Sequence, residues 1–98
     1  MNIQAMMKQA QKLQKEMMET KENINKQVFT GTSSFVTVEV NGNKEVLKVT
    51  IDSESIEKDE IEMLQDMIMI ATNEAFKKVD KEIDSKMGKY TQGMPGLF

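Results

Sequence analysis

The hydrophobic positions of the first 26 residues repeat with the period of an α-helix. Between residues 3 and 24 the spacings alternate between three and four, and Thr20 is the one polar member of the series. Such spacing gathers the side chains in one stripe along a helix. We therefore expect an amphipathic helix over residues 1–26. Its apolar seam consists of Ile3, Met6, Ala10, Leu13, Met17, Thr20 and Ile24.

The lysines of this segment fall on the other side of the expected helix. In the same heptad frame Lys8, Lys12 and Lys15 lie opposite the seam, where an ammonium group stays hydrated. Periodicity alone favours an ordinary solvated face over a phosphate-binding one. A phosphate-binding role for these lysines needs support from another observation.

Two later stretches alternate with the period of a β-strand. Residues 35–40 place valines at every second position, and residues 46–51 alternate in the same way. Asn41 and Gly42 between them are typical of a tight primed turn with positive φ angles, which Asn43 would lengthen. The pattern predicts an antiparallel hairpin.

A third strand is expected just before this hairpin. Residues 27–32 contain Val28, Phe29 and Thr30 and end at Gly31 and two serines, a β-prone run followed by turn residues. A two-stranded ribbon alone is only marginally stable. We therefore assign residues 27–52 to three antiparallel strands.

The C-terminal part of the chain has helical spacing again. Asp59 and Glu62 are spaced as a capping box, and apolar residues keep the helical period up to about Tyr90. We expect a helix over residues 59–90 and a flexible tail over residues 91–98. The whole, residues 1–98, is predicted to be one α+β domain.

This second helix is long for so small a domain. At about 1.5 Å per residue it exceeds 40 Å, whereas a compact chain of this size has a radius of gyration near 13 Å. Its first half also contains a run that is apolar around the whole circumference, which one small sheet cannot cover. We infer a homodimer in which this run is buried between subunits. The run is Met67, Ile68, Met69, Ile70 and Ala71.

Composition narrows the chemistry available to the chain. The 98 residues include 13 basic side chains, all of them lysine, and 16 acidic ones, for a net charge of −3. Arginine, histidine, cysteine and tryptophan are absent. Nucleophile and base pairs built on Cys or His, and zinc sites built on the same side chains, are therefore excluded. We expect a protein that is not an enzyme and has no cofactor or metal.

The negative charge is concentrated in one segment. Residues 52–66 hold seven acids against Lys58 alone, so the lysines elsewhere outnumber the acids. Acidic residues stabilise the N-terminus of a helix through its dipole, and in a loop they keep the chain hydrated. Either role explains this segment. A divalent-metal site, and with it a carboxylate-metal hydrolase, is the less favoured alternative, because the spacing matches no calcium loop.

Four segments of the chain carry a family resemblance. They are residues 7–17 (MKQAQKLQKEM), the Thr30-Gly31 strand, the hairpin from Val38 to Ile51 and the closing residues 94–98 (MPGLF). Together they resemble the YbaB/EbfC family of bacterial nucleoid-associated proteins. The resemblance covers essentially the whole chain, and residues 7–17 are its most specific part.

This resemblance implies a tweezer-like homodimer whose projecting helices bind double-stranded DNA and contribute to nucleoid organisation. The family's DNA contacts are attributed to basic residues of those helices. Because lysine lacks the planar fork that reads guanine edges, little sequence specificity is expected. The implied candidates are Lys8, Lys12 and Lys15, ranked first, with Lys77, Lys78, Lys81, Lys86 and Lys89.

A second reading of the sequence is a small dimeric adaptor that holds another protein through its Met-rich helices or its C-terminal tail. For either function we expect a cytoplasmic protein, located in the nucleoid if it binds DNA. The longest apolar run, Met67 to Ala71, is far short of the roughly 18 residues of a membrane span. Neither a membrane nor a small-molecule substrate is expected as a partner.

Overall fold

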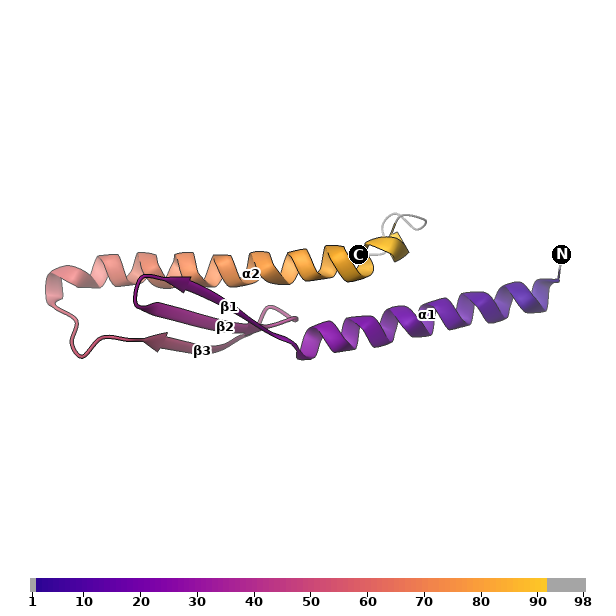
Figure 1. The fold of residues 1–98 in the computed structure, drawn as a ribbon, viewed down its shortest axis with the longest axis horizontal. Coiled ribbons are helices and arrows are strands. Elements are labelled where there is room, and N and C mark those ends of the chain that lie inside the picture. Colours follow the sequence, from indigo (N-terminus) through magenta and orange to yellow (C-terminus); the bar gives the residue numbers. More distant parts are fainter. Residues whose placement is uncertain (1, 92–98) are drawn as a thin grey trace.

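The computed structural model of the protein describes residues 2–91. A helix, three strands and a second long helix follow one another along the chain, with a single 3₁₀ turn before the last helix (Figure 1). The sheet is antiparallel in the order β1-β2-β3. The α+β architecture predicted from the sequence is confirmed. The elements are α1 (Ile3–Lys26), β1 (Val28–Ser33), β2 (Val36–Asn41), β3 (Val46–Ile51), η1 (Lys58–Glu60) and α2 (Ile61–Thr91).

Local hydrogen bonds set the ends of α1. The side-chain oxygen of Asn2 accepts from the Gln4 N–H at 3.0 Å, which satisfies one of the free donors of the first turn. At the other end Gln27 is extended, and its N–H donates to the Ile24 carbonyl at 3.0 Å. The chain then enters β1 directly.

The hairpin between β2 and β3 differs from the tight turn that was predicted. Gly42 does not adopt a positive φ, whereas Lys44 does, at 61°. The tight turn was wrong, and the longer loop that Asn43 was expected to allow is formed instead, because the Asn41 side chain organises it. Its oxygen accepts from the Asn43 N–H at 2.9 Å and the Glu45 N–H at 3.0 Å.

Gly31 also has a role that the sequence did not indicate. It lies inside β1, paired with Val38, instead of ending the strand. A Cβ at this position would lie 2.6 Å from the Ala75 nitrogen and still closer to the Ala71 oxygen. The absence of a side chain therefore lets α2 lie directly against β1.

The second helix begins at a different cap from the predicted one. The Glu57 N–H donates to the Glu60 side chain at 3.3 Å, and the Glu60 N–H donates to the Glu57 carbonyl at 2.9 Å. The capping residues are thus Glu57 and Glu60, and the prediction of Asp59 with Glu62 was wrong. The 3₁₀ turn of η1 moves the start of α2 to Ile61.

The core lies where α2 crosses β1 and β2. Alternate residues of β2 are fully buried against small and branched side chains of α2, which is the burial expected for a sheet covered on one face. A second, smaller cluster forms where the last turns of α1 meet α2. The first cluster is Val36, Val38, Val40, Ala71, Ala75 and Val79, and the second is Ile24, Met87 and Tyr90.

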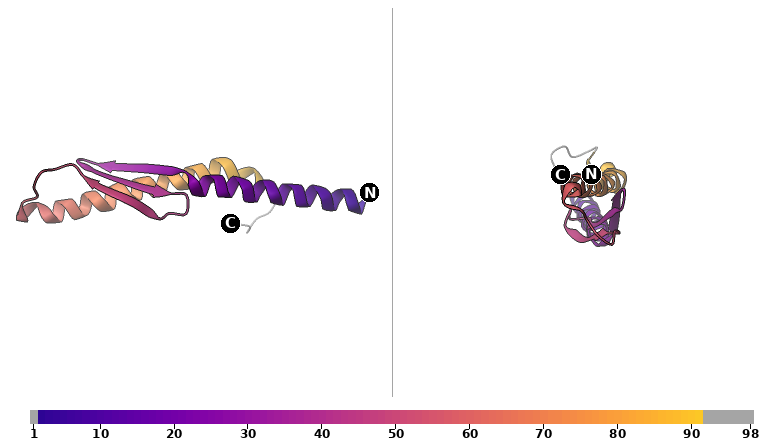
Figure 2. Two further views of the ribbon diagram at one scale, coloured as in Figure 1. Left: turned by 90° about the horizontal axis from the view of Figure 1, so that it is seen from below. Right: turned by 90° about the vertical axis from the view of Figure 1, so that its left-hand side faces the viewer.

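The molecule is strongly elongated. Its principal extents are 71 × 21 × 14 Å, and its radius of gyration is 19.4 Å. In both views α1 runs past the end of α2, so that its first turns have no neighbouring element among the described residues (Figures 1 and 2). We call this free part, residues 3–16, the arm. All of its residues are exposed.

The apolar run predicted to form the dimer interface is divided between two environments. Met69 and Ile70 are exposed, at 55% and 51%, whereas Met67 and Ile68 pack partly against the core. Ala71 is fully buried against β1 within the single chain. The close approach of α2 at Gly31 uses that face of the helix. The assignment of the whole run to a dimer interface stays a prediction.

Candidate nucleic-acid interface

The arm concentrates positive charge on one side. Lys8, Lys12 and Lys15 are separated by four and three residues, so they share one helix face and span about 10 Å along the axis. Among residues 2–91, no partner forms a hydrogen bond or ion pair with these three ammonium groups. They are therefore available for an external anion.

Two further features make the arm electropositive. It has no acidic residue before Glu16 and none in its first turn. The free N–H groups at a helix N-terminus carry a partial positive charge of their own. From residue 16 onward the charge reverses, since Glu16, Glu19 and Glu22 outnumber Lys21 and Lys26. The positive charge of α1 therefore lies on the part of the arm before residue 16.

The candidate lysines of α2 lie in a different setting. Lys77, Lys81 and Lys86 are exposed but alternate with acidic residues along the helix. Lys78 is engaged within the chain, because its Nζ donates to the Thr30 carbonyl at 2.6 Å and lies 3.7 Å from Glu74. This contact helps to fix α2 on β1.

Lys89 is the last candidate on α2. Its Nζ lies 4.9 Å from the centre of the Tyr90 ring, a cation–π distance. The structure thus brings Lys8, Lys12 and Lys15 together on one face and leaves the α2 lysines dispersed. Nothing in the sequence around Lys78 indicated its bond to Thr30, 48 residues away.

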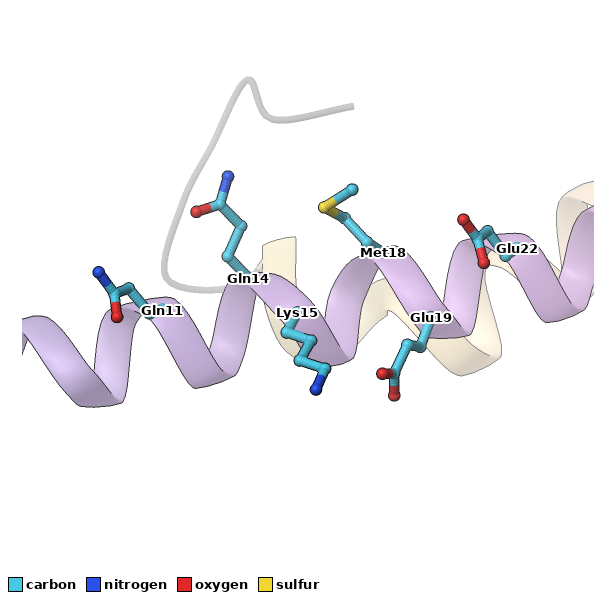
Figure 3. A pocket seen from close by; sticks show the side chains of 6 residues that line it. All are labelled: Gln11, Gln14, Lys15, Met18, Glu19 and Glu22. Carbon is cyan, nitrogen blue, oxygen red and sulfur yellow. The ribbon is translucent and has the colours of Figure 1, made fainter.

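The hollows along α1 are open surface features. One is lined by Gln11, Gln14, Lys15, Met18, Glu19 and Glu22. Figure 3 shows the side chains of this set leaving opposite sides of the same helix, with Lys15 and Glu19 directed away from Gln14 and Met18. One helix cannot enclose a small molecule. Such a surface suits contact with an extended partner.

The acidic segment lies at the other end of the molecule. It joins β3 to α2, opposite the tip of the arm (Figure 1). Within residues 2–91, no three acidic side chains are close enough together to hold a metal ion. The long axis therefore runs from an acidic end to a basic arm. This separation was visible in the sequence only as two segments of opposite charge.

Comparison with known proteins identifies the family. A model of the YbaB/EbfC DNA-binding family matches residues 1–94. The chain belongs to this family. A nucleoid-associated protein of Ligilactobacillus salivarius is 41% identical over 99% of this chain and 95% of its own length. One from Bacillus licheniformis is 50% identical over 99% of this chain and 94% of its own length.

The YbaB/EbfC chain also shares its fold with a protein of known structure. An uncharacterized protein from Helicobacter pylori superposes with a TM-score of 0.74 at 23% identity, covering 92% of this chain and 97% of the other. At that identity the likeness concerns the fold alone. Separately, none of the helices within residues 2–91 has the length and apolar character needed to cross a membrane.

Proposed function

We propose that this YbaB/EbfC-family chain binds duplex DNA as a homodimer and contributes to nucleoid organisation in the cytoplasm. The observation that carries the proposal is the arm, a helical projection with Lys8, Lys12 and Lys15 on one face and no acidic residue before Glu16. Two of the relatives described above are named nucleoid-associated proteins. The proposed function is binding alone, so no covalent bond is made or broken.

Phosphate contacts supply the affinity in this proposal. Each lysine that neutralises a phosphate releases condensed counterions, so that binding weakens as salt rises. The three arm lysines span about 10 Å, close to the rise of three base pairs at 3.4 Å each. Without arginine, bidentate readout of guanine is lost. Duplexes of unrelated sequence should therefore bind alike.

The test compares two triple variants of equal charge. One replaces Lys8, Lys12 and Lys15 by glutamine, which preserves helix propensity. The control replaces Lys26, Lys48 and Lys58, which are exposed lysines outside the candidate set. Fluorescence anisotropy with two unrelated duplexes is recorded between about 50 and 200 mM salt, where counterion release is measurable.

We expect the unaltered protein to give a slope of log affinity against log salt near −5, as for about six phosphates per dimer. The arm variant should lose most of this slope and at least about tenfold in affinity at the lowest salt. The control should retain both. Equal losses in the two variants would remove the arm lysines from the proposal.

The exposed seam of the arm favours a second candidate function. Ile3, Met6 and Leu13 lie on the face opposite the lysines and are exposed, a surface that phosphate contacts do not use. This surface suits a protein partner of the adaptor type. In that case Ile3→Asn with Met6→Gln would release a specifically bound protein and leave DNA affinity unchanged. Of the predicted tail, residues 91–98, Thr91 belongs to α2, and residues 92–98 lie outside the described residues.

A further inference from the structure

A pocket lies where three parts of the chain meet at the packed end of α1. Its walls come from the last turns of α1, the β2–β3 loop and the second half of α2. Figure 1 shows this loop beside the end of α1. The volume is about 350 Å³, within the range of small-molecule sites. We call this space, lined from within residues 21–25, 42–44 and 83–87, the junction pocket.

A close approach between the loop and α1 shapes the junction pocket. A Cβ at Gly42 would lie 2.8 Å from the Asn25 Cα and closer still to the Ile24 carbonyl. The loop backbone therefore lies directly against the helix backbone. The Asn41 side chain holds the loop in this conformation through the two hydrogen bonds described above. The walls are thus formed in the free chain, as in most ligand sites.

The floor of the junction pocket is aliphatic. Ile24 and Met87 are each only 2% exposed, and Ile83 packs against the same cluster. Among residues 2–91, no aromatic and no acidic side chain lines the pocket. Such a floor accepts a flexible hydrocarbon chain, because binding removes apolar surface of both partners from water.

The rim of the junction pocket carries positive charge. Lys21 lines it from α1, and Lys44 lines it from the β2–β3 loop. Asp80 pairs with Lys44 at 2.6 Å, which positions this ammonium group and leaves it further N–H donors. Two lysines and one aspartate sum to a charge of +1 at the rim. The rim therefore favours a ligand with a single negative charge.

Two side-chain amides add neutral donors to the rim. Asn25 and Asn43 line the pocket, and neither side chain forms a hydrogen bond with another residue in the range 2–91. Asn25 is half-buried, so its unpaired amide gains from a polar ligand. Each amide supplies two N–H donors. Cationic and neutral donors thus surround an aliphatic floor.

We propose that the junction pocket binds a small aliphatic carboxylate. Its hydrocarbon chain lies on Ile24, Ile83 and Met87, and its carboxylate accepts charge-assisted hydrogen bonds from Lys21 and Lys44. A carboxylate carries one negative charge, which matches the rim, whereas a phosphate monoester carries about 1.5 to 2 at pH 7. The arm lysines lie outside the pocket, so this site is independent of the proposed DNA contacts.

A bound carboxylate joins three elements that otherwise meet over a small area. α1 packs on α2 through one small cluster, which contains Ile24, Met87 and Tyr90. A ligand in the junction pocket contacts α1, the loop and α2 together. Because a ligand that binds only the folded chain stabilises it by mass action, the melting temperature should rise with ligand concentration.

The first test titrates the full ¹⁵N-labelled chain with octanoate and follows its amide chemical shifts. We expect saturable shifts centred on Asn25, Gly42 and Asn43, with a dissociation constant on the order of 1 mM, as for so small a ligand. Octanol has the chain without the charge, and acetate has the charge without the chain. Each should bind at least about tenfold more weakly, because each lacks one half of the interaction.

Three results of this titration would overturn the proposal. One is the absence of saturable shifts up to about 20 mM octanoate, far above the expected dissociation constant. Another is equal binding of octanol and octanoate, which would remove the role of the cationic rim. The third is a set of shifts centred on the exposed apolar positions of the arm, which would indicate adsorption to a different surface.

The second test removes the rim cations. Lys21→Gln combined with Lys44→Gln should weaken octanoate binding at least about tenfold, because the charge-assisted hydrogen bonds are lost. The matched control is Lys26→Gln with Lys48→Gln, which removes two exposed lysines of α1 and β3 outside the pocket. It should change the affinity by less than about twofold. Circular dichroism verifies that both proteins fold, and equal octanoate affinities in the two would refute the site.

Discussion

Two glycines determine how closely the helices approach the sheet. Gly31 faces the backbone of α2, and Gly42 faces the carbonyl of Ile24 in the last turns of α1. At both positions a Cβ would meet backbone atoms, which cannot rotate away as a side chain can. Gly88, in α2, has open space at the corresponding position. Close packing therefore requires glycine at positions 31 and 42, whereas position 88 has room for a side chain.

Replacing Gly31 by alanine should lower the free energy of unfolding by about 1–3 kcal/mol or more, because α2 must move away from β1. Gly88→Ala is the control and should raise stability by up to about 1 kcal/mol, since alanine favours a helix interior. Urea denaturation followed by circular dichroism measures both. If the two variants were equally stable, the close packing of α2 at Gly31 would be refuted.

Among the elements, α1 consists of a packed C-terminal part and an exposed N-terminal part. Its last turns pack on α2 through Ile24, with Met17 partly buried beside them, whereas residues 3–16 are exposed. A free helix of this length is marginal in water, and the arm is continuous with a packed segment that nucleates it. The arm should therefore be the least stable helical part of the described chain.

Amide hydrogen exchange tests this gradient along α1. We expect arm amides to exchange at least about 100-fold faster than those around Ile24, as local opening free energies range from near zero to the global value. Adding duplex DNA should slow exchange in the arm and leave core amides such as that of Ala75 unchanged. Uniform protection along α1 in the free protein would contradict this view.

Periodicity was sufficient to predict the helices and strands, because both depend on local spacing. The features that were missed depend on partners distant in sequence or on side-chain geometry. Gly31 and Ala71 meet only after α2 packs on β1, and the Asn41 side chain decides the hairpin loop. For the candidate site, spacing grouped the arm lysines correctly, whereas the engagement of Lys78 needed the fold.

At the scale of the whole molecule, opposite charges lie far apart. The protein is 71 Å long, and its acidic segment and basic arm occupy opposite ends (Figure 1). Interactions between exposed charges that lie more than about 8–10 Å apart are largely screened at physiological salt. The net charge of −3 therefore says little about the potential that DNA meets at the arm.

Single neutralisations at the two ends should thus differ in effect. Glu16→Gln, at the base of the arm, should tighten DNA binding by about two- to fivefold, because it removes a negative charge within reach of the arm lysines. Glu54→Gln changes the net charge equally in the acidic segment and should alter affinity by less than about twofold. Anisotropy at about 150 mM salt compares the two. Equal effects would mean that net charge governs binding.

The single arm of each chain also bears on gene dosage. In the proposed homodimer two arms act together, so a chain without a partner offers DNA one arm alone. Below the dissociation constant the amount of dimer follows the square of the chain concentration. Halving expression would then cut the two-armed form about fourfold, and the occupancy of DNA would respond to protein abundance as a threshold.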